Sequence, residues 1–492
     1  MEILRTPETI APYLTDTSGL HDAHCEAVYR PRRIDEIGEV LAAARRRGVG
    51  VTVSGAHTAT TGAALPYGGV LLSTDRLDRI GPIEEGEGGG RLRVEAGVRL
   101  ATVQGATAAT GWIYPPDPGE SKATLGGNLS THAAGKHGFH YGPSRRWVAG
   151  LKVVLADGDR LELTRGGCVA DENALLHLTT ATGRRIDVPL PTTPPPPVKH
   201  AAGYLGGVGC DAVDLFVGAE GTLGVIAAAT LRLTPAPEQS LAGLLFFPDE
   251  ATCWQAVVAI RDRSRGATGP IEGRWGTTIL EYLDPLAVDL LRPELGPLPP
   301  GAAALMVEQP TTAADAEVRL TEWERLCTEL GGCTGAHIWA RTAAEKEALA
   351  ALRYRIPTEM NATIARTGLR KVSCDMAVPD GRLLDYLRGA RERLAAGRVR
   401  AVGFGHIGDN HIHYNLLPED EGELARAREI YDQLVEFALA LGGTVSAEHG
   451  IGKLKRRYLA RMVGKAGIAA MQRTRHALDP EGLLCPGNLF AT

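Results

Sequence analysis

The chain has 492 residues, so we expect two or three domains rather than one hydrophobic core. With 44% hydrophobic and 23% charged residues, its composition is that of a globular protein and excludes a disordered chain. Lysine and arginine number 53 and aspartate and glutamate 58, so the net charge of −5 gives no sign of a nucleic-acid-binding or membrane-binding surface.

The N-terminus and the cysteines bear on the compartment. Residues 1–14 lack the positive region and apolar run of a signal peptide, and no stretch reaches the roughly 20 apolar residues of a membrane-spanning helix. The eight cysteines are scattered without a CxxC pair, which is typical of reduced thiols and not of a disulfide framework or a thiolate zinc site. We therefore expect a cytoplasmic protein.

Short strands dominate the N-terminal half. Residues 34–44 carry apolar side chains at helical spacing, and Gly48 is placed to end that helix. A β-branched strand over 50–53 then leads into a loop rich in glycine and threonine. The apolar runs 151–155 and 160–163 flank an Asp-Gly pair, which predicts a hairpin.

Two proline-rich stretches divide the chain. The run PTTPPPPV at 191–198 predicts a stiff, extended segment within a surface insertion covering about 165–200. The run TPAP at 234–237 follows a strand and predicts a domain boundary. We therefore expect a first domain, a second domain and a C-terminal segment at 1–234, 235–440 and 441–492.

Beyond residue 235, apolar strands alternate with helical patterns. The helical patterns cover 250–263, 314–330, 343–353, 380–395 and 421–441. Strands such as 241–247 and 302–307 lie among them, which predicts an α+β domain with an antiparallel sheet. No GxGxxG motif lies between a strand and a helix, so we expect no Rossmann unit.

Three glycine-rich segments lie in the N-terminal half, at 54–63, 115–135 and 218–226. A pyrophosphate needs several backbone N–H groups that point inward, and only small residues let the chain come that close. Each segment taken singly is also typical of an ordinary glycine-rich turn. Their order and content together favour a cofactor site.

Histidines and a glutamate gather in the C-terminal half. The run GHIGDNHIHYN places His411 and His413 on one face of a predicted strand, and His406 can reach that face through the turn at Gly408. Glu448 lies 35 residues after His413, beyond the predicted helix at 421–441. Two imidazoles and a carboxylate suit a divalent metal that keeps positions open for substrate, although strand histidines are often only hydrogen-bonded core residues.

Taken together, these motifs resemble a known family. The runs YPPDPGESKATLGGNLSTHAAG, WVAGLKVVLADG and GAEGTLGVI resemble the vanillyl-alcohol oxidase/p-cresol methylhydroxylase superfamily of flavoproteins. Within it the sequence is most similar to the branch that contains D-lactate, glycolate and D-2-hydroxyglutarate dehydrogenases, over nearly the whole chain. The resemblance implies an FAD-binding domain of two α+β subdomains at 1–234, an α+β cap at 235–440 and a C-terminal segment that returns to the FAD domain.

The resemblance implies that noncovalently bound FAD lies along the three glycine-rich segments. The cofactor-binding residues that it implies are Ser54, Gly55, Ala56, His57, Thr58, Gly62, Ala63, Pro116, Pro118, Gly119, Thr124, Gly126, Gly127, Asn128, Thr131, Ala133, Gly135, Glu220, Gly221, Gly224 and Ile226. His57 has two interpretations, a covalent link to the isoalloxazine ring, as in some flavoproteins of the superfamily, or a loop histidine near the phosphates. We favour the second, because most relatives in this branch bind FAD noncovalently.

Carried over by position, the resemblance implies that His406, His413 and Glu448 bind a divalent metal. Zinc is the first choice, with manganese and iron open. The chain departs from the family pattern at Asn410-His411, where the family usually has glycine and then asparagine. His411 is therefore either a third imidazole ligand or a partner just outside the ligands.

The resemblance also implies the groups that act on substrate. His449 matches the family's proposed general base, and an imidazole suits that task near neutral pH. The metal would lower the pKa of the α-hydroxyl and hydride would pass to flavin N5. Arg353, Asn415 and Lys455 match contacts to substrate carboxylates, while Lys371 is a weaker match. Lys455 also lies in a basic run that is typical of a solvated helix face.

These matches imply an FAD-dependent oxidoreductase acting on a 2-hydroxy acid, with the substrate and the electron acceptor open. One alternative is an oxidase of an alcohol or specialised metabolite that uses oxygen. Another is a redox-neutral transferase resembling alkylglycerone-phosphate synthase, whose run of three histidines is interrupted here by Ile412. A homodimer through the cap is implied by likeness alone, and we expect no nucleic-acid partner.

Overall fold

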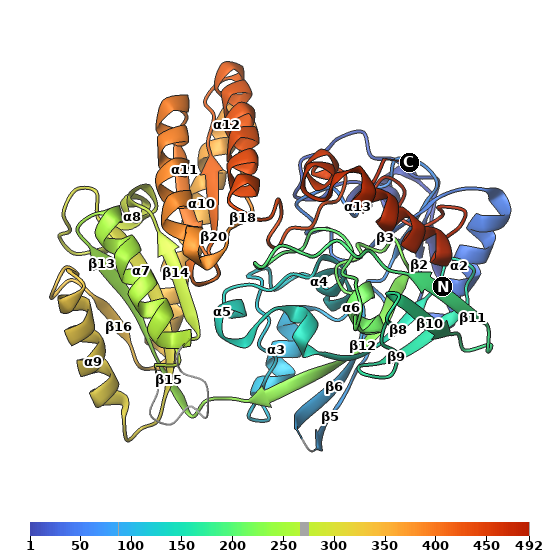
Figure 1. The fold of residues 1–492 in the computed structure, drawn as a ribbon, viewed down its shortest axis with the longest axis horizontal. Coiled ribbons are helices and arrows are strands. Elements are labelled where there is room, and N and C mark those ends of the chain that lie inside the picture. The colour runs from blue at the N-terminus through green and yellow to red at the C-terminus, as the bar shows by residue number, and fades with distance from the viewer. Residues whose placement is uncertain (87, 266–274, 492) are drawn as a thin grey trace.

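The computed structural model describes residues 1–86, 88–265 and 275–491, and it has two halves (Figure 1). The half that contains both chain ends is built from the N-terminal residues and from the C-terminal segment, while the other is built from the residues between them. Strand β12 (Val225–Pro235) runs toward the second half, whose first strand is β13 (Gln239–Phe247). The fold is α+β, as the sequence predicted.

A four-stranded sheet opens the first half. Its order is β1 (Glu2–Leu4), β2 (Val28–Arg30), β4 (Val70–Ser73), β3 (Val51–Ser54), with β2 and β3 both parallel to β4. Helix α2 (Ile34–Arg47) buries Ile37 and Leu41 completely, and Gly48 ends it at a φ of 63°. The helix predicted from residues 34–44 is thereby confirmed. The glycine-rich loop that begins at Ser54 leaves the end of β3.

A second, antiparallel sheet completes the first half. Its strands are β5 (Ile80–Gly86), β6 (Gly89–Glu95), β12, β8 (Val148–Val154) and β9 (Arg160–Thr164), with β7 (Trp112–Ile113) paired to β12. The hairpin predicted around residue 157 is confirmed by the pairing of β8 with β9. Short helices α3 (Leu100–Ala108), α4 (Leu125–Thr131), α5 (Gly138–Tyr141) and α6 (Ala212–Phe216) occupy the connections.

The segment 165–200 was expected as a surface insertion, and the structure corrects this in part. It forms a hairpin of β10 (Leu175–Thr179) and β11 (Arg185–Pro189), whose apolar face is buried, with Leu176 and Val188 fully covered. Helix α13 (Arg456–Leu478) lies against β11, and the Thr474 hydroxyl donates to the Pro189 carbonyl at 2.5 Å. Alternating apolar residues need a partner surface, and the C-terminal helix supplies it.

The second half is an antiparallel sheet with helices on both faces. Its strand order is β16 (Ile338–Ala340), β13, β15 (Ala303–Thr311), β14 (Ile279–Leu283), β19 (Ala401–Gly405), β20 (His411–Leu416), β17 (Val372–Ser373), and β18 (Met376–Ala377) also pairs β20. One core cluster combines Tyr282 with side chains of α7 (Glu250–Arg265), α9 (Ala316–Glu329), α11 (Leu383–Gly397) and α12 (Glu421–Ala440). The other combines Leu283 with side chains of α8 (Pro285–Leu291) and α10 (Ala343–Thr367).

All five helical patterns predicted beyond residue 235 correspond to helices of this half, although α10 continues through Pro357 to Thr367. After α12 the chain crosses back to the first half (Figure 1). There the N–H of Val51 donates to the carbonyl of Leu483 and the N–H of Cys485 to the carbonyl of Val51, each at 2.8 Å. Among the described residues no helix is long and apolar enough to cross a membrane.

Candidate active site

The three glycine-rich segments meet in one cavity of about 220 Å³. The predicted cofactor-binding residues that line it are Ser54, Gly55, Ala56, His57, Thr58, Ala63, Pro118, Thr124, Gly126, Gly127, Asn128, Thr131, Ala133, Glu220, Gly221, Gly224 and Ile226. Gly119 lines a larger neighbouring cavity, whereas Gly62, Pro116 and Gly135 line neither of the two. Segments more than 150 residues apart in the sequence thus share one cavity wall.

Small residues allow these segments to pack closely. A Cβ atom on Gly55 would lie 2.2 Å from Thr124 Oγ1, and one on Gly126 would lie 2.7 Å from the Cβ of Ala96. His57 adopts a positive φ of 59°, and its ring nitrogens lie 3.2 and 3.3 Å from Ser54 Oγ. This close packing, with main chain along the cavity, fits a cofactor whose pyrophosphate is held by backbone N–H groups.

The side chain of Glu220, which lines the glycine-rich cavity, also contacts the C-terminal segment. It accepts hydrogen bonds from the backbone N–H groups of Ile451 and Gly452 at 2.6 and 2.7 Å. Burial raises its pKa to about 7, although these two hydrogen bonds oppose the shift. The carboxyl group therefore fastens the C-terminal segment beside the cavity. Gly135 also contacts the C-terminal segment, because its N–H donates to Glu448 Oε1 at 2.5 Å.

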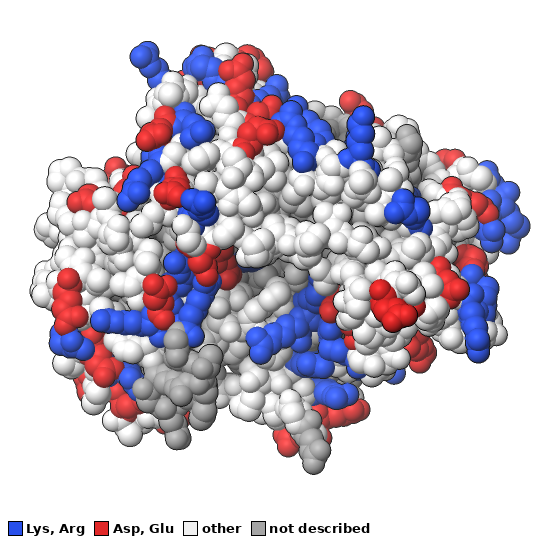
Figure 2. Space-filling view, viewed as in Figure 1, with Lys and Arg blue, Asp and Glu red and all other residues white. Residues whose placement is uncertain are grey.

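A larger cavity of about 720 Å³ lies between the two halves, and it is lined by residues of both. Figure 2 shows a hollow between the halves on this face of the molecule, with lysine and arginine side chains at its edge. All the predicted substrate, metal and catalytic residues line it, namely Arg353, Asn415, Lys455, His406, His413, Glu448 and His449, and so does Lys371. Glu448 and His449 also line the glycine-rich cavity, so the two spaces meet there.

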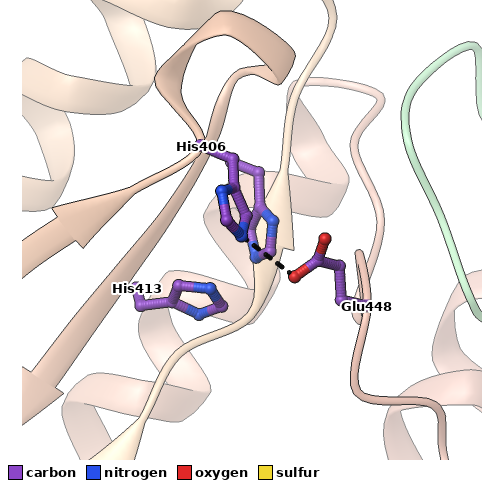
Figure 3. Close-up of side chains that lie close together, drawn as sticks. His406, His413 and Glu448 are labelled. Atoms are coloured by element: carbon purple, nitrogen blue, oxygen red, sulfur yellow. Dashed lines mark ion pairs between the residues drawn. The ribbon is translucent and has the colours of Figure 1, made fainter. Parts of the chain in front are cut away.

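The predicted metal ligands come together in space. His406, His411, His413 and Glu448 each offer a ligand atom, and these atoms lie within 4.8 Å of one another. Figure 3 shows His406 directed at Glu448, with 3.2 Å between His406 Nε2 and Glu448 Oε2, and His413 beside them. His406 follows β19, His413 lies on β20 and Glu448 follows α12, so three separate elements build the group.

The outer atoms of these ligands already have partners. His406 Nδ1 pairs with Glu281 Oε1, and His413 Nδ1 lies 3.2 Å from the carbonyl oxygen of Cys374. Glu448 Oε1 lies 2.5 Å from Lys199 Nζ. His406 Nε2 faces Glu448 Oε2, and the ligand atoms of the group lie within 4.8 Å of one another, so the group fits a divalent ion.

Burial and neighbouring charges set the protonation of two of these ligands. Burial raises the pKa of Glu448, but His406 and Lys199 outweigh it and hold the pKa well below its ordinary value. Burial lowers the pKa of His413 well below its ordinary value, so its imidazole is neutral. A carboxylate and a neutral imidazole are the forms that bind metal.

The predicted base His449 lies beside a fully buried carboxylate, that of Asp375. The backbone N–H of His449 donates to Asp375 Oδ2 at 3.0 Å, and its ring Nδ1 lies 3.5 Å from the same oxygen. Burial lowers the pKa of His449, although Asp375 opposes the shift. The ring of His449 also stacks on that of His413 at 5.1 Å. Its imidazole is thus unprotonated near neutral pH and able to accept a proton.

Asp375 also holds Lys455 and His411. The ammonium group of Lys455, a predicted substrate contact, donates to Asp375 Oδ2 at 2.7 Å and to Ser446 Oγ at 3.1 Å. His411 Nε2 lies 3.0 Å from Asp375 Oδ1, which favours the position outside the metal ligands. Lys455 is 6% exposed, so it is no part of a solvated helix face.

The other predicted substrate contacts line the large cavity from the second half of the molecule. Arg353 Nη2 donates to Glu281 Oε2 at 3.1 Å, and the guanidinium carbon lies 5.0 Å from the ring centre of Phe404. Asn415 accepts from the Ser373 hydroxyl at 2.8 Å. The weaker candidate Lys371 donates to Asn361 Oδ1 at 3.1 Å.

Three charged residues of the site were not assigned from the sequence. They are Lys199, Glu281 and Asp375, each with a side chain at most 8% exposed. Glu281 and Asp375 interrupt apolar runs, ILEYL and CDMAV, and an acidic residue inside such a run was an available signal, because buried carboxylates need partners. No motif around Lys199 indicated that its ammonium group would contact Glu448.

A glycine-rich cavity that meets a second cavity lined by histidines, a carboxylate and an arginine is suited to an enzyme that holds an organic cofactor beside its substrate. Comparisons with known proteins identify that cofactor. The family model for the C-terminal domain of FAD linked oxidases matches residues 236–489, and that for an FAD binding domain matches residues 25–164. The chain therefore belongs to the FAD linked oxidases and is an FAD-binding oxidoreductase, which confirms the resemblance seen in its motifs.

Curated relatives share almost the full length. The chain is 29% identical over 486 residues to glycolate oxidase subunit GlcD of Bacillus subtilis (strain 168), covering 97% of this chain and 92% of the relative. It is 30% identical to a D-2-hydroxyglutarate dehydrogenase of Xanthomonas citri pv. viticola, covering 95% and 89%. It is 28% identical to a probable mitochondrial D-lactate dehydrogenase of Danio rerio, covering 94% and 84%.

Among solved structures, an alkyldihydroxyacetonephosphate synthase superposes with a TM-score of 0.67. The match covers 98% of this chain and 82% of the other, at 14% sequence identity. An identity this low supports a common fold and no common activity.

Proposed function

We propose that the protein oxidises a 2-hydroxy acid of the D-lactate, glycolate or D-2-hydroxyglutarate type to the 2-keto acid, with FAD as the hydride acceptor and a divalent metal at His406, His413 and Glu448. One observation carries the proposal. The ligand group, His449 and Arg353 line one cavity, and Glu448 and His449 also line the cavity of the glycine-rich segments. The names of the relatives, which act on hydroxy acids, support the same chemistry.

The reaction removes a proton from oxygen and a hydride from carbon. When bound, FAD accepts the α-hydrogen as hydride and the metal lowers the pKa of the α-hydroxyl, with zinc the first choice. His449 takes the hydroxyl proton on its Nε2, because Nδ1 faces Asp375. Asp375 fixes the orientation of that ring and is itself held by Lys455 and Ser446.

The cap supplies the groups that bind the substrate carboxylate. Arg353 presents a planar guanidinium whose Nη2 is anchored on Glu281, so its remaining N–H groups can donate to a carboxylate in the cavity. Asn415 lines the same wall, and its side chain is fixed by Ser373. These groups orient the α-carbon.

The test is the replacement His449→Gln. Loss of a positioned base costs roughly 10²- to 10⁴-fold, so we expect flavin reduction by the hydroxy acid under anaerobic conditions to slow by that factor. FAD content, measured by absorbance after denaturation, stays at the wild-type value. The exposed hairpin histidine gives a matched control, and His177→Gln retains the wild-type rate. A wild-type rate in the His449 variant would remove the base from the proposal.

A further inference from the structure

One buried carboxylate joins the metal group to the substrate-binding arginine. Glu281 is the central residue of β14, all five residues of which are buried, and its side chain is 2% exposed. Strand pairing sets Tyr282 opposite Gly405, which brings Glu281 beside His406. Its Oε1 pairs with His406 Nδ1, and its Oε2 accepts from Arg353 Nη2 at 3.1 Å.

The first of these contacts determines how His406 faces the metal group. A carboxylate that holds one ring nitrogen of an imidazole fixes the orientation of the ring, so that the other nitrogen can face a metal. Glu281 takes Nδ1, so Nε2 points at Glu448 Oε2, 3.2 Å away. Without Glu281 the ring would lose the partner that holds its Nδ1 side.

The second contact determines how Arg353 faces the cavity. Its side chain is 20% exposed, and its guanidinium lies over the ring of Phe404. Anchoring Nη2 on Glu281 holds the plane of the guanidinium, which reduces the side-chain entropy lost when a carboxylate binds. Glu281 is therefore the shared partner of a metal ligand and of a substrate-binding group that come from different elements, the end of β19 and α10.

We propose that Glu281 is a positioning residue that couples the two halves of the reaction site, orienting His406 toward the metal and Arg353 toward the substrate carboxylate. The inference rests on the proposed function for its substrate and on the ligand geometry for its metal. Loss of Glu281 weakens both metal and substrate binding, whereas a change in Arg353 weakens substrate binding alone.

The experiment compares Glu281→Gln with the wild type. Zinc and manganese dissociation constants are measured by competition with a chromogenic chelator, and KM and kcat are measured at saturating metal. Removing such an outer partner costs roughly 10- to 100-fold in metal affinity, and we expect that rise in Kd. At saturating metal, KM stays raised at least about tenfold while kcat changes less, because Arg353 has still lost its anchor.

Two further variants serve as controls. Arg353→Lys raises KM and leaves the metal Kd no weaker than in the wild type. Glu308→Gln alters a carboxyl group on the neighbouring strand β15 that lines the same cavity, and among the described residues it forms no hydrogen bond or ion pair with His406 or Arg353. It leaves the metal Kd unchanged.

The outcomes separate this inference from the proposed function. A Glu281→Gln protein with the wild-type metal Kd, or with a wild-type KM at saturating metal, overturns the coupling even if hydroxy acids reduce the flavin. If no hydroxy acid reduces the wild-type flavin, the proposed function fails. The metal Kd of the Glu281→Gln variant then still tests whether Glu281 positions His406 toward the metal. Should the Gln variant not fold, Glu281→Asp retains the charge with a shorter reach, and both Kd and KM rise by smaller factors. Unchanged values in a folded Asp variant would contradict the inference.

Discussion

At the scale of single residues, Asp375 organises the side of the site that accepts the proton. Its carboxylate is fully buried and accepts from Lys455, Ser446 and the backbone of His449. Burying a charge is costly unless it is paired, so the ammonium group of Lys455 stabilises Asp375 in place. Lys455 therefore acts on the reaction through Asp375, and its direct contact to substrate stays a prediction from the resemblance.

The replacement Lys455→Met tests this role. It leaves Asp375 as an uncompensated buried charge, a change that typically costs about 3–5 kcal/mol. We expect a lower Tm by calorimetry and a kcat at least tenfold lower, with KM changed by less than about threefold. Lys465→Met, at an exposed position of α13, is the matched control and keeps both wild-type values. A raised KM at an unchanged Tm would instead make Lys455 a substrate contact.

At the scale of elements, the C-terminal segment is fastened to the FAD-binding half by a few short contacts. Glu220, in the turn between α6 and β12, accepts from the N–H groups of Ile451 and Gly452. The N–H of Lys453 donates to the Thr61 carbonyl at 2.9 Å. These contacts fix the residues just after His449, so docking of this segment positions the base.

Glu220 gives this docking a pH dependence. Its folded-state pKa of about 7 lies above the ordinary 4.5, so its contribution to stability is greatest below pH 4.5 and is lost as the pH rises to about 7. We expect the stability difference between wild type and Glu220→Gln to favour the wild type by ~2–3 kcal/mol more at pH 5 than at pH 8. Thermal unfolding of both proteins at the two pH values measures it. An equal difference in Tm at both pH values is the contrary result.

At the scale of the whole molecule, local patterns predicted much of the fold. The helices α2, α7, α9, α11 and α12 follow from apolar residues at helical spacing, and the hairpin of β8 and β9 follows from its turn. The histidines lie close together because β20 sets His411 and His413 two residues apart and the turn after His406 is short. Such features depend on a few neighbouring residues, so the sequence displays them.

The rest depends on contacts between distant parts of the chain. Glu281 and His406 are 125 residues apart, and Gly135 and Glu448 are 313 apart, so no local pattern links them. The burial of the hairpin within 165–200 likewise depends on α13, which comes nearly 300 residues later. Its alternating apolar residues predict a covered face but cannot identify what covers it.

The whole molecule places a predicted metal group and a predicted base where the FAD-binding half meets the second half. The most direct test is anaerobic mixing of the FAD-loaded protein with D-lactate, glycolate and D-2-hydroxyglutarate, with and without prior removal of metal by a chelator. We predict that at least one acid bleaches the visible absorbance of the oxidised flavin, that chelation slows this at least about tenfold, and that added zinc or manganese restores it. An oxidised flavin with every acid, or full-speed bleaching in a metal-free protein, would contradict the proposed function.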